Sequence, residues 1–209
     1  MEHIVLLGDS VFDNKVYVDG APDVVHHLRS MLPGDWKATL CAVDGSTTAD
    51  IEAQIRSVPK DASCLFVSVG GNDALMHMGL LYDTTLDGHS LLTELARLAD
   101  GFRVDYMRAI EHVCRLEKPT CLCTIYNGNV ADLANRVEAA VAVLNDRIYS
   151  VANERRLPVI DLRRICNRPE DYANPIEPSD IGGKKIASAI LEHIKTRNSL
   201  NPACFPTIP

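Results

Sequence analysis

The sequence contains no apolar run long enough to span a lipid bilayer, which takes about 20 residues. It also has no basic excess: 21 Lys and Arg residues stand against 28 Asp and Glu, which gives a net charge of −7. Nucleic acids and anionic membranes select basic surfaces, so neither kind of partner is expected. The first ten residues, MEHIVLLGDS, lack the basic start and long apolar stretch of a signal peptide. We therefore expect a cytoplasmic protein.

Internal repeats and low-complexity linkers are absent as well. A chain of 209 residues is long enough for one well-buried domain and short for two. Hydrophobic residues make up 46% and charged residues 23%, which is ordinary for a soluble globular protein. The sequence therefore predicts a single domain over residues 1–197 and a proline-containing tail over residues 198–209.

Cysteines are present, but their pattern does not indicate disulfides or a metal site. Their number is odd, and in a chain expected to be intracellular they are interpreted as reduced thiols. Cys121 and Cys123 form a C-x-C motif without a second pair or a nearby His, so core or surface thiols are favoured over metal ligands. We expect neither a metal nor a cofactor. The seven cysteines are Cys41, Cys64, Cys114, Cys121, Cys123, Cys166 and Cys204.

Short apolar runs alternate along the chain with segments of helical periodicity. The predicted strands are residues 3–8, 36–43, 63–71, 120–127 and 157–162. The predicted helices are residues 22–32, 48–58, 91–116 (one broken helix or two short ones), 130–155 and 182–195, with an irregular stretch between 72 and 90. Strands that are apolar throughout and alternate with helices indicate a parallel sheet covered on both faces.

Small and polar residues follow the predicted strands. Parallel sheets of this kind bind ligands at the carboxyl ends of their strands, so these residues are expected to meet at one edge. That edge is therefore the place to look for an active site. The residues in question are Gly8-Asp9-Ser10, Asp44-Gly45-Ser46, Gly70-Gly71-Asn72-Asp73 and Tyr126-Asn127.

These motifs, in this order and with a Pro-Ser-x-x-Gly before the last helix, resemble the SGNH/GDSL hydrolase family from about residue 3 to residue 195. The tripeptide GDS is weak evidence alone, but GDS, Gly and G-x-N-D after successive strands form a specific set. The resemblance implies a flavodoxin-like α/β/α sandwich of about five parallel strands in the order 2-1-3-4-5. It also implies hydrolysis of a small-molecule carboxylic ester without a cofactor.

The resemblance assigns the nucleophile to Ser10, which would form an acyl-enzyme. It assigns the oxyanion hole to the backbone N–H groups of Ser10 and Gly45 and to the side-chain amide of Asn72. Such donors must point at the charge that develops on the carbonyl oxygen. Taken singly, these residues could equally be two turn residues and a helix cap. Their joint occurrence favours the catalytic interpretation.

The last motif of the family reads Asp-x-x-His-Pro-Ser, whereas this chain has Asn174 and Glu177 at the Asp and His positions. One hypothesis makes Glu177 the base, oriented by Asn174. A carboxylate is ordinarily the weaker base by about two pKa units, and burial could close much of that gap. A pairing of Glu177 with Arg163 or Arg164 would lower the pKa of Glu177 and oppose this role.

Two other hypotheses stay open. Another histidine could act as the base, with His77 the main candidate and the pair His26-His27 more consistent with a surface helix. Alternatively, the protein could be a weakly active or inactive binding protein that keeps the pocket. The residues leave the acyl and alcohol specificity and the oligomeric state open.

The remaining candidates are weaker. Asp9 is expected to hold the turn around Ser10 through side-chain hydrogen bonds, and Asp13 and Asn14 are expected to do the same for the following loop. His77 could contact substrate. Tyr17, Tyr126 and Asn127 could shape the pocket.

Overall fold

The fold is a five-stranded parallel sheet with the strand order β2-β1-β3-β4-β5, as predicted. The computed structural model describes residues 2–130 and 133–199. All four neighbouring strand pairs run parallel. The strands are β1 (His3–Gly8), β2 (Lys37–Leu40), β3 (Cys64–Ser68), β4 (Thr120–Cys123) and β5 (Val159–Ile160).

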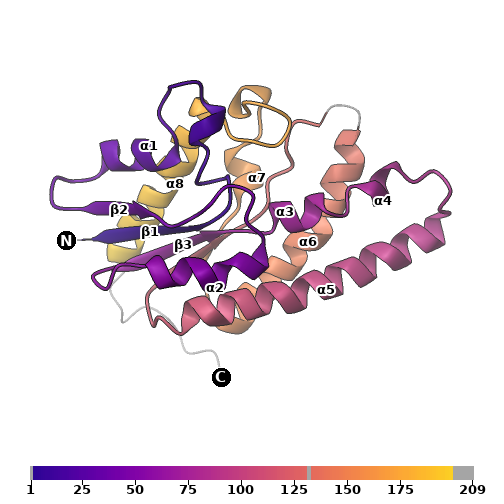
Figure 1. Cartoon of the computed structure of the whole chain (residues 1–209), viewed down its shortest axis with the longest axis horizontal. Helices are drawn as coiled ribbons and strands as arrows, with labels where there is room; N and C mark the ends of the chain where they lie inside the picture. Colours follow the sequence, from indigo (N-terminus) through magenta and orange to yellow (C-terminus); the bar gives the residue numbers. More distant parts are fainter. Residues whose placement is uncertain (1, 131–132, 200–209) are drawn as a thin grey trace.

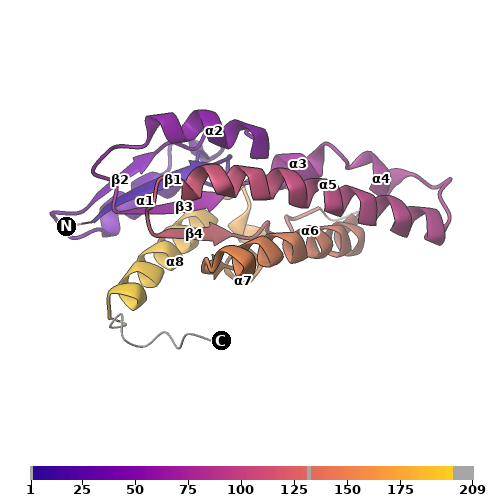
Figure 2. The ribbon, with the colours of Figure 1, turned by 90° about the horizontal axis from the view of Figure 1, so that it is seen from below.

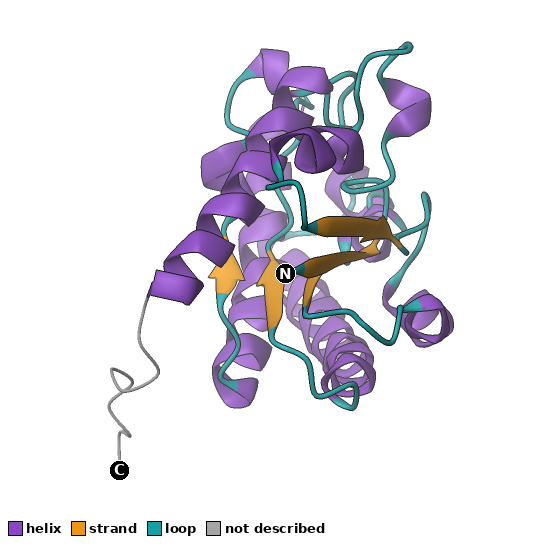
Figure 3. Ribbon diagram, turned by 90° about the vertical axis from the view of Figure 1, so that its left-hand side faces the viewer, coloured by secondary structure: helices purple, strands orange, loops and turns teal. Residues whose placement is uncertain are grey.

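Helices cover both faces of this sheet. In Figure 1, α1 lies above the sheet, and α2 and α5 lie below it. Figure 2 gives the view from below, and Figure 3 shows the strands between helices on both sides. The main helices are α1 (Val24–Met31), α2 (Ile51–Gln54), α5 (Gly88–Cys114), α6 (Ala134–Arg155) and α8 (Asp180–Ser199). The other helices, of four or five residues like α2, are α3 (Gly71–Leu75), α4 (Gly79–Tyr82) and α7 (Leu162–Ile165).

The two-sided burial follows from side-chain alternation along the strands. On β1, Ile4 and Leu6 belong to a core cluster shared with α1 and α8. Val5 and Leu7 point to the opposite face and belong to a cluster shared with α5 and α6. All four side chains are fully buried. Strand β1 is therefore buried on both faces, and its apolar run is why its position could be predicted.

Two predicted helices differ from the structure. The segment predicted as one broken helix or two short ones is a single continuous helix, α5, because Gly101 lies inside it without ending it. The predicted helix over residues 48–58 is instead three short pieces: α2 lies between two 3-10 turns, at Thr48–Asp50 and at Ile55–Ser57.

The ends of several elements also differ from the sequence prediction. Strand β5 is only two residues long, because the chain enters α7 at Leu162. The stretch predicted to be irregular contains α3, α4 and the start of α5. Helix α8 continues to Ser199, and most of the predicted tail lies outside the described residues.

Within the described residues, six of the seven cysteines are free thiols, and Cys204 lies outside them. Cys121 and Cys123 share one face of β4 and are buried in the same core cluster. None of the helices described is long and apolar enough to cross a membrane.

Candidate active site

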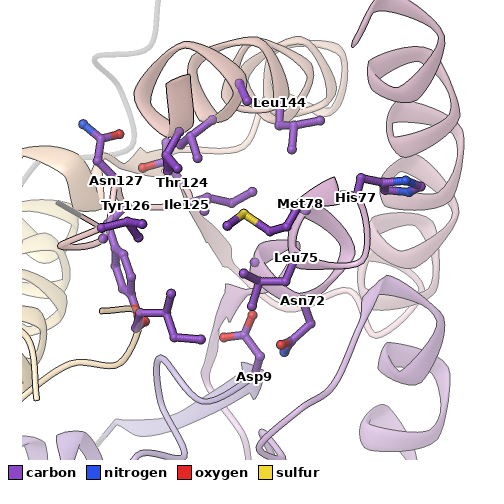
Figure 4. Close-up of a pocket in the computed structure, with 18 of the residues that line it drawn as sticks. Asp9, Asn72, Leu75, His77, Met78, Thr124, Ile125, Tyr126, Asn127 and Leu144 are labelled. Atoms are coloured by element: carbon purple, nitrogen blue, oxygen red, sulfur yellow. The ribbon is translucent and has the colours of Figure 1, made fainter. Parts of the chain in front are cut away.

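A cavity opens at the carboxyl end of the sheet, next to the ends of β1, β3 and β4. Ser10, Asn72 and Glu177 line it together with Asp9 and Asn127. Its empty volume is about 1020 Å³, including the open mouth. In Figure 4, the side chains of Asp9 and Asn72 are both seen at the lower end of the cavity. The structure thus brings together residues from four of the predicted motifs.

The nucleophile candidate stands on a tight turn directly after β1. Gly8 approaches β3 so closely that a Cβ at this position would lie 1.7 Å from the carbonyl oxygen of Ser68. The Asp9 N–H donates to the same oxygen at 3.0 Å, and Asp9 Oδ1 accepts from Val11 N–H at 3.1 Å. Only glycine fits such a close approach, and the turn presents a Ser10 that is 7% exposed.

Gln54 fixes the end of β1, and the sequence analysis missed it. Its side-chain amide donates to Gly8 O at 2.7 Å and accepts from Gly8 N–H at 2.8 Å. The same amide nitrogen donates to Ser46 Oγ at 3.0 Å. The signal was present in the sequence: Gln54 occupies a buried position between Ile51 and Ile55, where an apolar residue is expected.

Asn72 lies in the first turn of α3, directly after β3. Its Nδ2 donates to the carbonyl oxygen of Ser46 at 2.9 Å, which ties α3 to the turn after β2. Gly45 precedes Ser46, is exposed, and is not among the residues that line the cavity. Among the described residues, no hydrogen bond engages the backbone N–H of Ser10 or of Gly45. Both remain available as donors.

Asn174 holds the backbone of the Glu177 loop. Asn174 Oδ1 accepts hydrogen bonds from the N–H groups of Ile176 and Glu177, each at 2.9 Å. Tyr126 donates its hydroxyl to Ile176 O at 2.6 Å, and Asn14 donates to Pro178 O at 3.1 Å. The loop is therefore fixed on both sides of Glu177.

The Pro-Ser-x-x-Gly motif fixes the start of α8. Ser179 Oγ accepts from Gly182 N–H at 3.2 Å, which caps the helix. A Cβ at Gly182 would lie 2.1 Å from Asp171 O, so a larger residue would displace the loop that carries Glu177. The Pro-Ser-x-x-Gly motif therefore has a structural role that does not depend on whether residue 177 is a histidine or a glutamate.

Glu177 is a buried carboxylate with a raised pKa. Its side chain is 6% exposed, and its Oε2 has no hydrogen-bond partner of standard geometry. Burial raises the pKa of Glu177 to about 7, against an ordinary 4.5; a loose hydrogen bond from Ser10 lowers it, and the nearby charge of Asp44 raises it. Near neutral pH this group can both accept and release a proton.

Asp9 is a second buried carboxylate in the cavity. Burial raises its pKa to about 7, the hydrogen bond from Val11 N–H opposes that shift, and the negative charge of Glu177 adds to it. Ionisation of Glu177 thus disfavours ionisation of Asp9.

The arginine that could have paired with Glu177 has another partner, and the histidines considered as alternative bases are not placed for that role. The Arg163 guanidinium pairs with Asp161, with nitrogen–oxygen distances of 2.9 and 2.7 Å. His77 lines the cavity but is exposed, and in Figure 4 its ring is directed away from Asp9. His26 and His27 lie on α1, beside Asp23 and Asp180 respectively, and do not line the cavity.

Asp13 and Asn14 hold loops and do not line the cavity. Asp13 Oδ2 accepts from Asp44 N–H at 3.0 Å, and Tyr17 donates its hydroxyl to Asp44 Oδ2 at 2.8 Å. Asn127 does line the cavity, and its buried Oδ1 has no hydrogen-bond partner. In the part of the chain that the structure describes, no three His, Cys, Asp or Glu side chains converge as metal ligands would.

Comparison with known proteins gives one family and a set of similar folds. The model of the GDSL-like Lipase/Acylhydrolase family matches residues 6–182. Similar solved structures include the lipase Lip_vut3 from a goat rumen metagenome, with a TM-score of 0.69 and 19% identity over 92% of this chain and 97% of that one. No curated protein matches.

Two further structures show the same fold. Phospholipase A1 from Streptomyces albidoflavus NA297 has a TM-score of 0.70 and 13% identity over 91% of this chain and 98% of that one. The psychrotrophic esterase EstA from Pseudoalteromonas sp. has a TM-score of 0.67 and 12% identity over 96% of this chain and all of that one.

Proposed function

The chain belongs to the GDSL-like lipase/acylhydrolase family, a family of ester hydrolases, and we propose that it cleaves carboxylic esters through an acyl-enzyme on Ser10. Glu177 takes the place of the usual histidine as the base. The observation that carries the proposal is the arrangement of Ser10 and Glu177: both residues are buried and line one cavity, where Ser10 lies close enough to lower the pKa of Glu177.

Acylation begins when Glu177 accepts the Ser10 hydroxyl proton. Oγ then forms a bond to the ester carbonyl carbon, and the electron pair of the C=O bond moves onto the oxygen. That oxyanion is assigned to the N–H groups of Ser10 and Gly45 and to the Asn72 amide. When the tetrahedral intermediate collapses, the C–O bond to the alcohol breaks, and Glu177 returns its proton to the departing oxygen.

Deacylation repeats these steps with water. Glu177 accepts a proton from water, the water oxygen bonds to the acyl carbon, and the bond to Ser10 Oγ breaks. Glu177 then returns the proton to Oγ, which regenerates the serine and releases the carboxylic acid.

A pKa of about 7 brings Glu177 into the range of an ordinary histidine. The proton converts the carboxylate into a neutral acid, so no buried cation forms during the reaction. An orienting aspartate, which would stabilise such a cation, is therefore unnecessary. Asn174, a neutral residue, supports the loop without adding a third negative charge to the site.

Hydrolysis of a short activated ester, such as p-nitrophenyl acetate, tests the proposal. Wild-type protein should hydrolyse it, and Ser10→Ala should remove essentially all turnover while leaving the thermal transition in place. Equal rates for the two proteins would show that the hydrolysis does not use Ser10. Absence of turnover in both would favour a binding protein that keeps the pocket.

A further inference from the structure

The cavity extends from Ser10 into a deep apolar space away from the sheet, walled by α3, α4, the first half of α5 and the first half of α6. Resting on the proposed function, we infer that this space binds the acyl chain of the substrate, and that the preferred acyl group is unbranched with about eight carbons. In this arrangement the acyl portion of the ester lies in the apolar space, and the alcohol portion lies at the polar mouth of the cavity.

One face of α6 forms the long wall. Val137, Ala140, Val141 and Leu144 all line the cavity at the helical spacing i, i+3, i+4 and i+7. The opposite wall carries Leu75 and Met78, whose side chains lie within the space in Figure 4, and Leu95 and Leu98 of α5 add to it. Apolar groups on every side suit a hydrocarbon chain and give no partner to a polar one.

Asn145 sets the inner end of this wall. Its side-chain amide accepts from Ile125 N–H and donates to Ile125 O, both at 2.8 Å, directly after β4. Leu144 is therefore level with the carboxyl end of the sheet, where Ser10 stands. Val137 lies seven residues, or two helical turns, further out.

The chain length follows from this span. Seven helical residues rise by roughly 10 Å. Three backbone bonds advance an extended chain by about 3.8 Å, so a hydrocarbon advances by roughly 1.3 Å per bond. The wall therefore accommodates about eight bonds. At the outer end, Arg136 Nη1 donates to Leu81 O at 2.9 Å, and Val137 packs in one apolar cluster with Leu81. Helices α4 and α6 meet there, so their contact limits the length of acyl chain that the cavity can hold.

The position of Glu177 decides which end of the ester enters the cavity. Glu177 must give its proton to the leaving alcohol, so the alcohol lies on the Glu177 side of Ser10. That side is polar: the charge of Asp44 acts on Glu177, and Tyr17 and Asp13 bond to Asp44. The acyl chain therefore extends from Ser10 in the opposite direction, along α6.

A series of p-nitrophenyl esters from two to sixteen carbons tests this inference with the wild-type protein. Each methylene that is buried should raise kcat/KM by up to about fourfold. We expect a rise to about eight carbons and no further gain beyond. A fall from acetate onwards, or rates independent of length, would overturn the inference. The inference would also be overturned if lengthening the alcohol, from ethyl acetate to octyl acetate, raised kcat/KM more than lengthening the acyl group, from ethyl acetate to ethyl octanoate.

A matched pair of variants locates the effect. Ala140→Phe places a ring in the middle of the wall, and Ala142→Phe makes the same change on an exposed position of the same helix. Ala140→Phe should lower kcat/KM for the octanoate ester at least tenfold more than it lowers kcat/KM for the acetate ester. Ala142→Phe should change neither, and an equal loss in both variants would contradict the assignment of this wall.

Failure of the proposed function is distinguishable from failure of this inference. Turnover of acetate without any gain on octanoate contradicts only the acyl pocket. If no ester is hydrolysed, the proposed function fails, and the pocket is still tested by calorimetric titration of octanoate. Binding that Ala140→Phe weakens and Ala142→Phe does not would support the pocket. Absence of binding to the wild-type protein would contradict it.

Discussion

Asn174 Oδ1 accepts a hydrogen bond from the Glu177 N–H at 2.9 Å, and so contacts the backbone of Glu177 instead of its carboxylate. Asn174 is therefore a positioning residue for the loop. Asn174→Ala removes this bond and the one from Ile176 N–H. We expect a loss of roughly 1–2 kcal/mol in the free energy of unfolding and about a tenfold fall in kcat.

Asn174→Asp provides the conservative control, because a carboxylate oxygen accepts the same two hydrogen bonds. Urea unfolding should place it close to the wild type. Combined with Glu177→His, it rebuilds the usual arrangement of the family and should retain activity with an altered pH profile. If Asn174→Ala were as stable and active as the wild type, the loop would not depend on these bonds.

Asn72 offers a test of the oxyanion hole. Asn72→Ala removes one donor and should lower kcat about 10²- to 10³-fold, which corresponds to roughly 2.7–4 kcal/mol in the barrier. The hydrogen bond to Ser46 O is lost as well, so thermal unfolding must be followed in parallel. A variant that keeps both its melting temperature and its kcat would show that Asn72 is not such a donor.

The raised pKa of Glu177 predicts a cost in stability. The folded protein holds this proton up to about pH 7 and the unfolded chain only up to about 4.5, so stability should fall as pH rises between those values. Glu177→Gln removes this contribution and should stabilise the protein by about 3 kcal/mol at most above pH 7. Urea unfolding at pH 5 and pH 8 measures the effect. Equal changes at the two pH values would contradict it.

The charge of Asp44 should influence the pKa of the proposed base, Glu177. Its negative charge raises the pKa of Glu177, so Asp44→Asn should move the ascending limb of the pH–rate profile to lower pH. Asp44 is exposed, and the shift should be small and should shrink as salt is added. An unchanged limb at low salt would show that this charge does not reach Glu177.

Much of the fold could be predicted because β1 and β3 are apolar on both faces, and only a buried parallel sheet needs such strands. The end of β5 could not be predicted, because the Asp161 side chain caps α7 and the strand ends at Ile160, two residues before the apolar run does. The continuity of α5 was missed because Gly101 resembles a helix break, although packing elsewhere along the helix overrides its low propensity.

The candidate site could be predicted in part. The candidates Ser10 and Asn72 were found because their motifs follow strand ends, which parallel topology brings together, and Glu177 was found from the Pro-Ser-x-x-Gly motif before the last helix. The direction of the Asn174 side chain depends on a hydrogen bond within its own loop, which spacing does not reveal. Gln54 depends on a contact with Gly8 across 46 residues, and a sequence pattern shows only that a polar residue is buried there.

The central claim is that Glu177 activates Ser10, and the rate of covalent labelling by a fluorophosphonate tests it most directly. Mass spectrometry should locate the adduct on Ser10, and Ser10→Ala should give none. For the wild type the labelling rate should rise with pH through about 7, because the carboxylate form accepts the proton. Glu177→Gln, which keeps the shape of the side chain, should label about 10²- to 10⁴-fold more slowly, without that rise. Labelling of Glu177→Gln at the wild-type rate and with the wild-type pH profile would contradict the account.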